Sequence, residues 1–371
     1  MVKRLNGSDG SGRALRVSRL SGLKNSVVYN NKLVTYILNN SPFMTHVLED
    51  MYRTVHNRVL VAEARKDAGN LAGRLADIAT RFPDQVGTSE AEPVFVFSAG
   101  WRSGSTLLQR VLMSSGEIMV WGEPYSRANL TGTLLNQFRS FTVDWPRDYF
   151  FADTFSGELS EEWVANIYPS VGDLIESHRS FFINLFETPA RAYGRQRWGF
   201  KEARLGTEHA RYLKFLYPKA RFIFLYRNPY SAYKSFRHYI KGDFIEWPSR
   251  PVVSARSFAR TWRELVTDYE KNAPSLGGLF IAYEQFLKDP AVHQQVCDYV
   301  GAGLKLPREL SVIPAHGQKD KSESWQPEND LHWWEKSVLR HELGATAKRF
   351  GYNGPPDGGP GRAPSAASAR A

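Results

Sequence analysis

The stretch that decides the fold is residues 94–108, which read VFVFSAGWRSGSTLL. Its first four residues, 94–97, are all apolar, a pattern typical of a short strand that is buried on both faces of a parallel sheet. A turn rich in glycine and serine follows, and apolar residues then return at helical spacing at Leu107, Leu108 and Val111. The stretch therefore predicts a strand, a turn and a helix in direct succession.

The rest of the chain continues this alternation of strands and helices. Further strands are predicted at short apolar runs, at residues 118–120, 198–200, 221–226 and 279–282. Helix-like stretches lie between them, at residues 206–216, 231–239, 255–271 and 294–300. Strands that alternate with helices favour an α/β fold with a doubly wound parallel sheet flanked by helices.

The two ends of the chain differ from this pattern. Residues 1–26 form a basic leader rich in Arg and Ser, a composition that organelle transit peptides share with disordered tails. Because no amphipathic period runs through Gly7–Gly12, we expect a disordered leader, with organelle targeting as the alternative. Residues 27–90 predict an N-terminal helical extension, 91–352 the main domain, and 353–371 a disordered low-complexity tail.

Composition narrows the class of protein. The 371 residues carry a net charge of +10, which suggests anionic partners such as nucleic acid, a membrane surface or phosphate-bearing small molecules. The one cysteine, Cys297, excludes an internal disulfide and an all-cysteine metal cage. No apolar run approaches the ~18–20 residues that a membrane span needs, so we expect a soluble, cytoplasmic protein. The nine histidines lack the paired spacing of metal ligands, so we expect no metal.

The turn between the first strand and its helix has the properties of an anion site. Backbone N–H groups converge at the start of a helix, where the helix dipole adds positive charge. Gly104 lets a phosphate approach the backbone, and Ser105 and Thr106 add hydroxyl donors. Arg102 adds a guanidinium group, whose planar set of donors matches the geometry of phosphate or sulfate. The Gly-Lys pair of a nucleoside triphosphate loop is absent, and an ordinary strand–helix turn is the alternative.

A second anion site is predicted after the strand at residues 221–226. Arg227 follows that strand at its carboxyl end, where open α/β sheets place their ligands, and Ser235 lies eight residues further on in a helix. An Arg and a Ser at this interval can hold one phosphate from two directions, although a surface Arg beside a helix cap is the alternative. Two such sites at neighbouring strand ends predict a ligand with two separated phosphate groups.

At these positions the chain resembles the family of sulfotransferases that use 3′-phosphoadenosine-5′-phosphosulfate (PAPS). Residues 102–106 resemble the family's 5′-phosphosulfate loop, in the Arg-Ser-Gly-Ser form of its carbohydrate and bacterial members. Residues 227–235 resemble its 3′-phosphate motif, and 282–290 and 350–352 resemble later segments. The resemblance covers residues 93–352 and implies the P-loop-like fold of this family.

The resemblance also implies PAPS as the sulfuryl donor, without a metal. The residues that it assigns to the donor are Arg102, Ser103, Gly104, Ser105, Thr106, Arg227, Ser235, Tyr283, and Lys319 or Lys321. Leu107 departs from the pattern, because cytosolic members carry a Trp there, and the family's late Lys-rich pattern is blurred in residues 317–325.

Four residues are expected to carry the chemistry. Arg102 would stabilise the charge that grows on the leaving phosphate, and Lys201 would stabilise the transferring sulfuryl group unless it only pairs with Glu202. Glu123, in the sequence WGEPY, resembles the family's acceptor base, with a capping or substrate-orienting role as the alternative. His238 is a rival base or a solvated helix residue.

The acceptor is expected to be a small molecule or a glycan. The stretch 131–197 is predicted to build its pocket from aromatic residues, among them Trp145, Tyr149, Phe150, Phe151 and Trp163. Sugars, phenols and lipids all fit such a lining. Nucleic acid is not expected as a partner, and a homo-oligomer is compatible with the sequence. The competing functions are a nucleotide kinase of the P-loop type and an inactive relic whose basic leader binds polyanions.

Overall fold

The computed structural model describes residues 70–86, 89–125, 128–160, 164–237, 252–310 and 331–354. The chain divides into two compact units, Met1–Gly69 and Asn70–Ala371, and all described residues belong to the second. The predicted leader, most of the predicted helical extension and nearly all of the predicted tail lie outside the described residues. The predicted domain boundaries therefore stay predictions.

Five parallel strands form one sheet in the order β2-β3-β1-β4-β5. Their bounds are Val94–Ser98 for β1, Ile118–Trp121 for β2, Arg197–Glu202 for β3, Arg221–Tyr226 for β4 and Leu279–Ala282 for β5. Each strand that the apolar runs predicted is present, and the doubly wound parallel α/β fold is confirmed. Their order was not predicted: β3 lies between β1 and β2.

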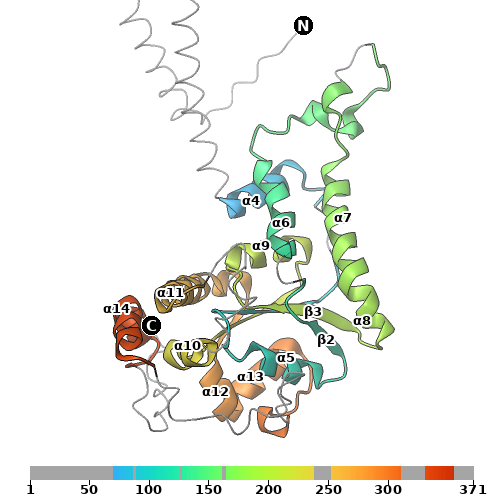
Figure 1. Cartoon of the computed structure of the whole chain (residues 1–371). Helices are drawn as coiled ribbons and strands as arrows, with labels where there is room; N and C mark the ends of the chain where they lie inside the picture. The colour runs from blue at the N-terminus through green and yellow to red at the C-terminus, as the bar shows by residue number, and fades with distance from the viewer. Residues whose placement is uncertain are drawn as a thin grey trace, which may run out of the picture. The chain divides into compact units, whose positions relative to one another are not determined.

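Helices connect the strands and cover both faces of the sheet (Figure 1). The α-helices are α4 (Leu71–Arg81), α5 (Ser105–Met113), α6 (Leu130–Leu135), α7 (Val171–Phe182), α8 (Thr188–Ala192), α9 (Thr207–Leu216), α10 (Pro229–Arg237), α11 (Ala255–Asn272), α12 (Tyr283–Lys288), α13 (Pro290–Val300) and α14 (Trp333–Arg349). The short helices are η2 (Asn136–Ser140), η3 (Asp148–Phe150), η4 (Ala152–Thr154), η5 (Val164–Asn166), the π-helix η6 (Ile183–Glu187), η8 (Pro274–Leu276) and η9 (Pro307–Glu309). In the described ranges, no helix is both long and apolar enough to cross a bilayer.

The two faces of the sheet bury different kinds of side chain. Successive residues of a strand point to opposite faces, so Phe95 and Phe97 of β1 enter one core and Val94 and Val96 the other. The first core is rich in aromatic rings and includes buried residues of α9 and α11. The second is mostly aliphatic and includes residues of α5 and α13, which Figure 1 shows together with α12 on one side of the sheet.

Helix α4 packs into the aromatic core. Leu71, Leu75 and Ile78 are buried there at helical spacing, and α4 contacts α9. Asn70 caps the helix by accepting a hydrogen bond from the N–H of Gly73. Of the helical extension predicted over residues 27–90, the described part contains this helix, at Leu71–Arg81.

Hydrogen bonds align the carboxyl ends of the three central strands. The N–H of Ala99 donates to the carbonyl of Leu225 at 2.9 Å, and that of Gly100 donates to the carbonyl of Ala203 at 2.9 Å. The buried Tyr269 hydroxyl of α11 donates to the carbonyl of Leu205 at 2.6 Å. The loop after β1 is therefore held against the ends of both neighbouring strands, β3 and β4.

Candidate functional site

The loop between β1 and α5 has an unusual backbone. Gly100, Arg102 and Gly104 have φ angles of 91°, 62° and 90°, all in the left-handed region. This region strains any residue other than glycine, and such strain is concentrated at functional sites. A Cβ atom built on Gly104 would lie 2.1 Å from ring atoms of Tyr283. Gly104 is thus required both by its φ angle and by the close approach of that ring.

Hydrogen-bond donors gather where α5 begins. The N–H groups of Ser105 and Thr106 lie in the first turn, where a helix has no internal acceptor for them. The Ser103 side chain is 1% exposed, and its Oγ has no hydrogen-bond partner among the described residues. A buried hydroxyl normally has a partner, so an orphaned one at a helix start fits an anionic ligand.

The two predicted anion sites adjoin each other, because β1 and β4 are neighbours in the sheet. Arg102 Nε donates to Ser235 Oγ of α10 at 2.9 Å. Arg227 Nη1, at the end of β4, donates to the carbonyl of Arg102 at 2.9 Å. Two guanidinium groups and one hydroxyl from both predicted motifs therefore form one continuous cluster.

Tyr283 packs against the guanidinium of Arg227, and the next residue, Asn228, caps the helix that follows. The guanidinium carbon of Arg227 lies 4.8 Å from the centre of the Tyr283 ring, the ring that also covers Gly104. Asn228 follows Arg227 and caps α10, since its Oδ1 accepts from the N–H groups of Tyr230 and Ser231. Tyr283, predicted as a donor contact, thus packs between the loop and Arg227.

A charged cluster lies at the ends of β2 and β3. Lys201 Nζ donates to Glu123 Oε1 at 3.0 Å, and Arg204 Nη2 donates to Glu123 Oε2 at 3.3 Å. The side chains of Glu123, Lys201 and Arg204 are 22%, 11% and 1% exposed. Each oxygen of the predicted base therefore contacts a different cation. Among the described ion pairs, the partner of Lys201 is Glu123. The sequence analysis had named Glu202 as the alternative partner.

Arg204 was missed by the sequence prediction. Its guanidinium carbon lies 4.4 Å from the centre of the Trp101 ring, and Trp101 stacks on Phe236 of α10 at 5.3 Å and 13°. Burial lowers the pKa of Arg204 to about 9, although the charges of Glu123 and Glu202 oppose the shift. The sequence feature that points to Arg204 is the charged run of residues 201–204, which directly follows the predicted strand at residues 198–200. The carboxyl ends of parallel strands are where open α/β sheets bind their ligands.

Glu202, which the sequence analysis named only as a partner for Lys201, is a second buried titratable group in this region. It is buried on β3, on the face opposite to Lys201. Burial raises the pKa of its carboxyl to about 8, the Glu123 charge adds to the shift, and Arg204 and Lys201 oppose it. Burial thus favours the neutral form of this carboxyl.

Three predicted site residues, His238, Lys319 and Lys321, lie outside the described residues, and their roles stay predictions. Within the described ranges, no group of three or more His, Cys, Asp or Glu is placed to hold a metal ion.

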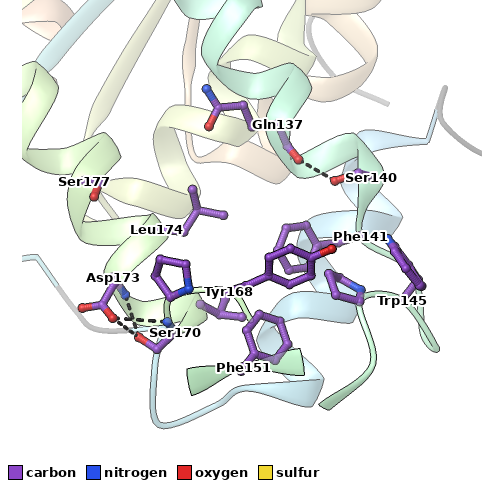
Figure 2. Close-up of a pocket in the computed structure, with 13 residues that line it drawn as sticks. Gln137, Ser140, Phe141, Trp145, Phe151, Tyr168, Ser170, Asp173, Leu174 and Ser177 are labelled. Atoms are coloured by element: carbon purple, nitrogen blue, oxygen red, sulfur yellow. Dashed lines mark hydrogen bonds between the residues drawn. The ribbon is translucent and has the colours of Figure 1, made fainter. Parts of the chain in front are cut away.

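A cavity of about 410 Å³ lies in the stretch predicted to bind the acceptor (Figure 2). Figure 2 shows the rings of Phe141, Trp145, Phe151 and Tyr168 gathered along it. Of the aromatic residues predicted for the acceptor pocket, Trp145 and Phe151 line this cavity, whereas Tyr149 and Phe150 do not, and Trp163 lies outside the described residues. None of the lining residues belongs to the loop or to the charged cluster. The assignment of the acceptor to this stretch stays a prediction.

Solved structures similar to the chain are sulfotransferases, at low identity. Mouse sulfotransferase SULT7A1 complexed with PAP is 12% identical, with a TM-score of 0.37, and the match covers 76% of this chain and 93% of that one. The sulfotransferase domain from the curacin biosynthetic pathway is 16% identical, with a TM-score of 0.37 and coverages of 70% and 99%. Sulfotransferase STF9 from Mycobacterium avium is 15% identical, with a TM-score of 0.31 and coverages of 78% and 85%. These scores are too low to support a functional argument.

The match to a family model is decisive. No curated protein matches the chain. The model described as "Sulfotransferase family" matches residues 93–305, more than half of the chain, and this range contains the loop, the Arg227 motif and the charged cluster. The chain therefore belongs to the sulfotransferase family.

Proposed function

We propose that the protein transfers a sulfuryl group from PAPS to a hydroxyl or amine of a small-molecule or glycan acceptor. The observation that carries this proposal is the contact between the two anion-binding motifs, in which Arg102 reaches Ser235 and Arg227 reaches the loop. Such a cluster presents fixed cations to a ligand with phosphates at both ends. Membership of the sulfotransferase family supports PAPS as that ligand.

The residues of the cluster divide between the two ends of the donor. The first N–H groups of α5, with the hydroxyls of Ser103, Ser105 and Thr106, would hold the 5′-phosphate. Arg227 and Ser235 would hold the 3′-phosphate. The orphaned Ser103 Oγ supports this assignment, because it needs an acceptor that the described residues do not supply.

Sulfuryl transfer needs positioning and charge stabilisation more than covalent catalysis, as in phosphoryl transfer. A bond forms between sulfur and the acceptor oxygen while the bond between sulfur and the 5′-phosphate oxygen breaks, which releases PAP. Arg102 would stabilise the negative charge that grows on the leaving phosphate. Lys201 would stabilise the oxygens of the transferring group.

Glu123 would accept the proton of the acceptor hydroxyl. In the structure both of its oxygens contact cations, Lys201 at Oε1 and Arg204 at Oε2. If Lys201 turns to the sulfuryl oxygens, Oε1 becomes available to the acceptor. Removing such a base lowers the rate by roughly 10²–10⁴-fold, so Glu123→Gln tests this step.

The test of the proposed function is a transfer assay with radiolabelled PAPS across glycans, phenols, lipids and peptides. Transfer of label to one of these classes, absent in Arg102→Ala, is the expected result. Binding of ATP with Mg²⁺ but not of PAP would contradict the proposal and favour a kinase. The absence of transfer together with polyanion binding that is lost on deletion of residues 1–33 would favour the inactive relic.

A further inference from the structure

We propose that Arg204 is a positioning residue, which holds Glu123 in the orientation for proton transfer and joins it to the donor loop through Trp101. This inference rests on the proposed function and assigns a role to a residue that neither the sequence motifs nor the family match singles out.

The two cations that hold Glu123 differ in their freedom to move. Lys201 is a flexible side chain that contacts Oε1, and it is more exposed than Arg204. Arg204 contacts Oε2 with a guanidinium on a side chain that is only 1% exposed. A planar guanidinium held by burial loses little entropy when it forms a hydrogen bond. Arg204 therefore sets the position of Oε2, and Oε1 becomes available to the acceptor when Lys201 turns to the sulfuryl oxygens.

A stack of rings links Arg204 to both donor-binding motifs. Arg204 lies over Trp101, which directly precedes Arg102 in the loop. Trp101 in turn stacks on Phe236, which directly follows Ser235 in α10. One continuous set of contacts thus runs from the proposed base to the two segments that would bind the donor. Displacement of the stack would displace the base relative to the donor.

The burial of Arg204 is costly, which argues against a passive structural role. A buried cation loses its hydration, and apolar residues of similar volume often stabilise a protein as well or better. The same ion pair places the carboxylate of the proposed base. Removing one partner of such a contact shifts a catalytic group, and a misplacement of 1 Å costs roughly 10²-fold in rate.

The experiment is a double-mutant cycle with Arg204→Met and Glu123→Gln. It is measured as kcat for transfer from radiolabelled PAPS to the acceptor that takes up most label in the assay above, and as the Kd for PAP. Arg204→Met is expected to lower kcat by roughly 10²-fold. It should leave the Kd for PAP within about twofold, because Arg102 and Arg227 keep their own contacts with Ser235 and the loop. In the Glu123→Gln background the same change should lower kcat by less than about threefold. Arg204→Lys keeps the charge without the planar stack and should lie between the wild type and Arg204→Met.

The matched control is Arg179→Met. Arg179 is a buried arginine on α7 that donates to the carbonyl of Leu216 and lies outside the site. Its loss should lower the unfolding temperature and leave kcat and the Kd for PAP unchanged. If Arg204→Met does not fold, Arg204→Lys still decides, since a merely structural role predicts an unchanged kcat for the folded fraction.

Three results would overturn the inference while the proposed function stands. The first is an unchanged kcat in the Arg204 variants, and the second is an equal fold-loss in kcat and in affinity for PAP. The third is a double mutant whose loss in kcat equals the product of the losses in Arg204→Met and Glu123→Gln, because independent residues behave in this way. If the wild-type protein transfers no sulfuryl group to any acceptor, the proposed function fails, and the inference fails with it.

Discussion

At the scale of single residues, Gly104 shows how one position serves both the fold and the site. It begins α5 at a φ angle of 90°, and the Tyr283 ring occupies the space of its missing Cβ. That ring also faces Arg227, so the glycine lets the loop and the second motif approach each other.

We expect Gly104→Ala to destabilise the protein by about 1–3 kcal/mol and to weaken PAP binding at least about tenfold. The substitution adds backbone strain and pushes Tyr283 away from the loop. Thermal unfolding and calorimetric titration with PAP measure the two effects. Gly157→Ala is the matched control, because Gly157 has a φ angle of 93° and no atom lies within 4 Å of the position that its Cβ would take. Unchanged PAP affinity in Gly104→Ala would contradict the account of the loop.

A second prediction at this scale concerns the buried carboxyl of Glu202. Its pKa is about 8 in the folded protein, against 4.5 for the ordinary carboxyl. The folded state therefore holds a proton that the unfolded chain releases between these pH values. The contribution of the Glu202 carboxyl to the free energy of unfolding is therefore fully present below pH 4.5, and it is lost as the pH rises through 8.

Glu202→Gln should therefore lose less stability than the wild type between pH 5 and pH 8. The difference in slope is at most about 1.4 kcal/mol per pH unit, the value for one proton. Urea unfolding at several pH values measures it. Parallel curves for the two proteins would show that Glu202 is ionised in the folded state.

At the scale of elements, the junction between β4 and α10 positions the second motif. Asn228 caps α10 and lies between Arg227 on one side and the helix that carries Ser235 on the other. Loss of an N-cap costs about 1 kcal/mol. The cap therefore contributes to the stability of α10 and to the spacing of the two donor contacts.

Asn228→Ala should lower stability by about 1 kcal/mol and also weaken PAP binding. Ser170→Ala removes a comparable cap at the start of α7, where Ser170 accepts from the N–H of Asp173. This control should show the loss of stability alone. Equal PAP affinities in the two variants would contradict a positioning role for the cap.

The packing of α7 on α9 gives a prediction about acid. His178 of α7 contacts the Tyr212 hydroxyl through Nδ1 at 2.6 Å and Gln137 Oε1 through Nε2 at 3.1 Å. Burial lowers the pKa of His178 to about 4. The unfolded chain binds a proton that the folded state does not, so stability falls as the pH falls from 6.5 towards 4.

His178→Gln should show a smaller loss of stability than the wild type across this pH range. Other groups also titrate there, but their effect is common to both proteins and cancels in the difference. Denaturant midpoints at pH 7, 6, 5 and 4 measure it. A wild-type loss no larger than that of the variant would contradict a neutral, buried His178.

At the scale of the whole molecule, the strands could be predicted from the sequence because a parallel strand that is buried on both faces consists of consecutive apolar residues. It did not predict their order, since the pairing of β3 with both β1 and β2 depends on contacts distant in sequence. The Arg102 and Arg227 motifs could be found because strand ends meet at one edge of a parallel sheet. Arg204 was missed because its burial and its contact with Trp101 depend on packing between distant segments, and the charged run 201–204 alone does not show which of its residues is buried.

The central claim is that Arg102 and Arg227 together bind a ligand with two phosphate ends. Its most direct test is calorimetric titration of the wild type, Arg102→Ala and Arg227→Ala with PAP and with ATP plus Mg²⁺. A charged hydrogen bond contributes about 1.5–3 kcal/mol, so each substitution should weaken PAP binding by roughly 10–100-fold, and ATP with Mg²⁺ should not compete. Equal PAP affinity in all three proteins, or preference for ATP with Mg²⁺, would contradict the claim.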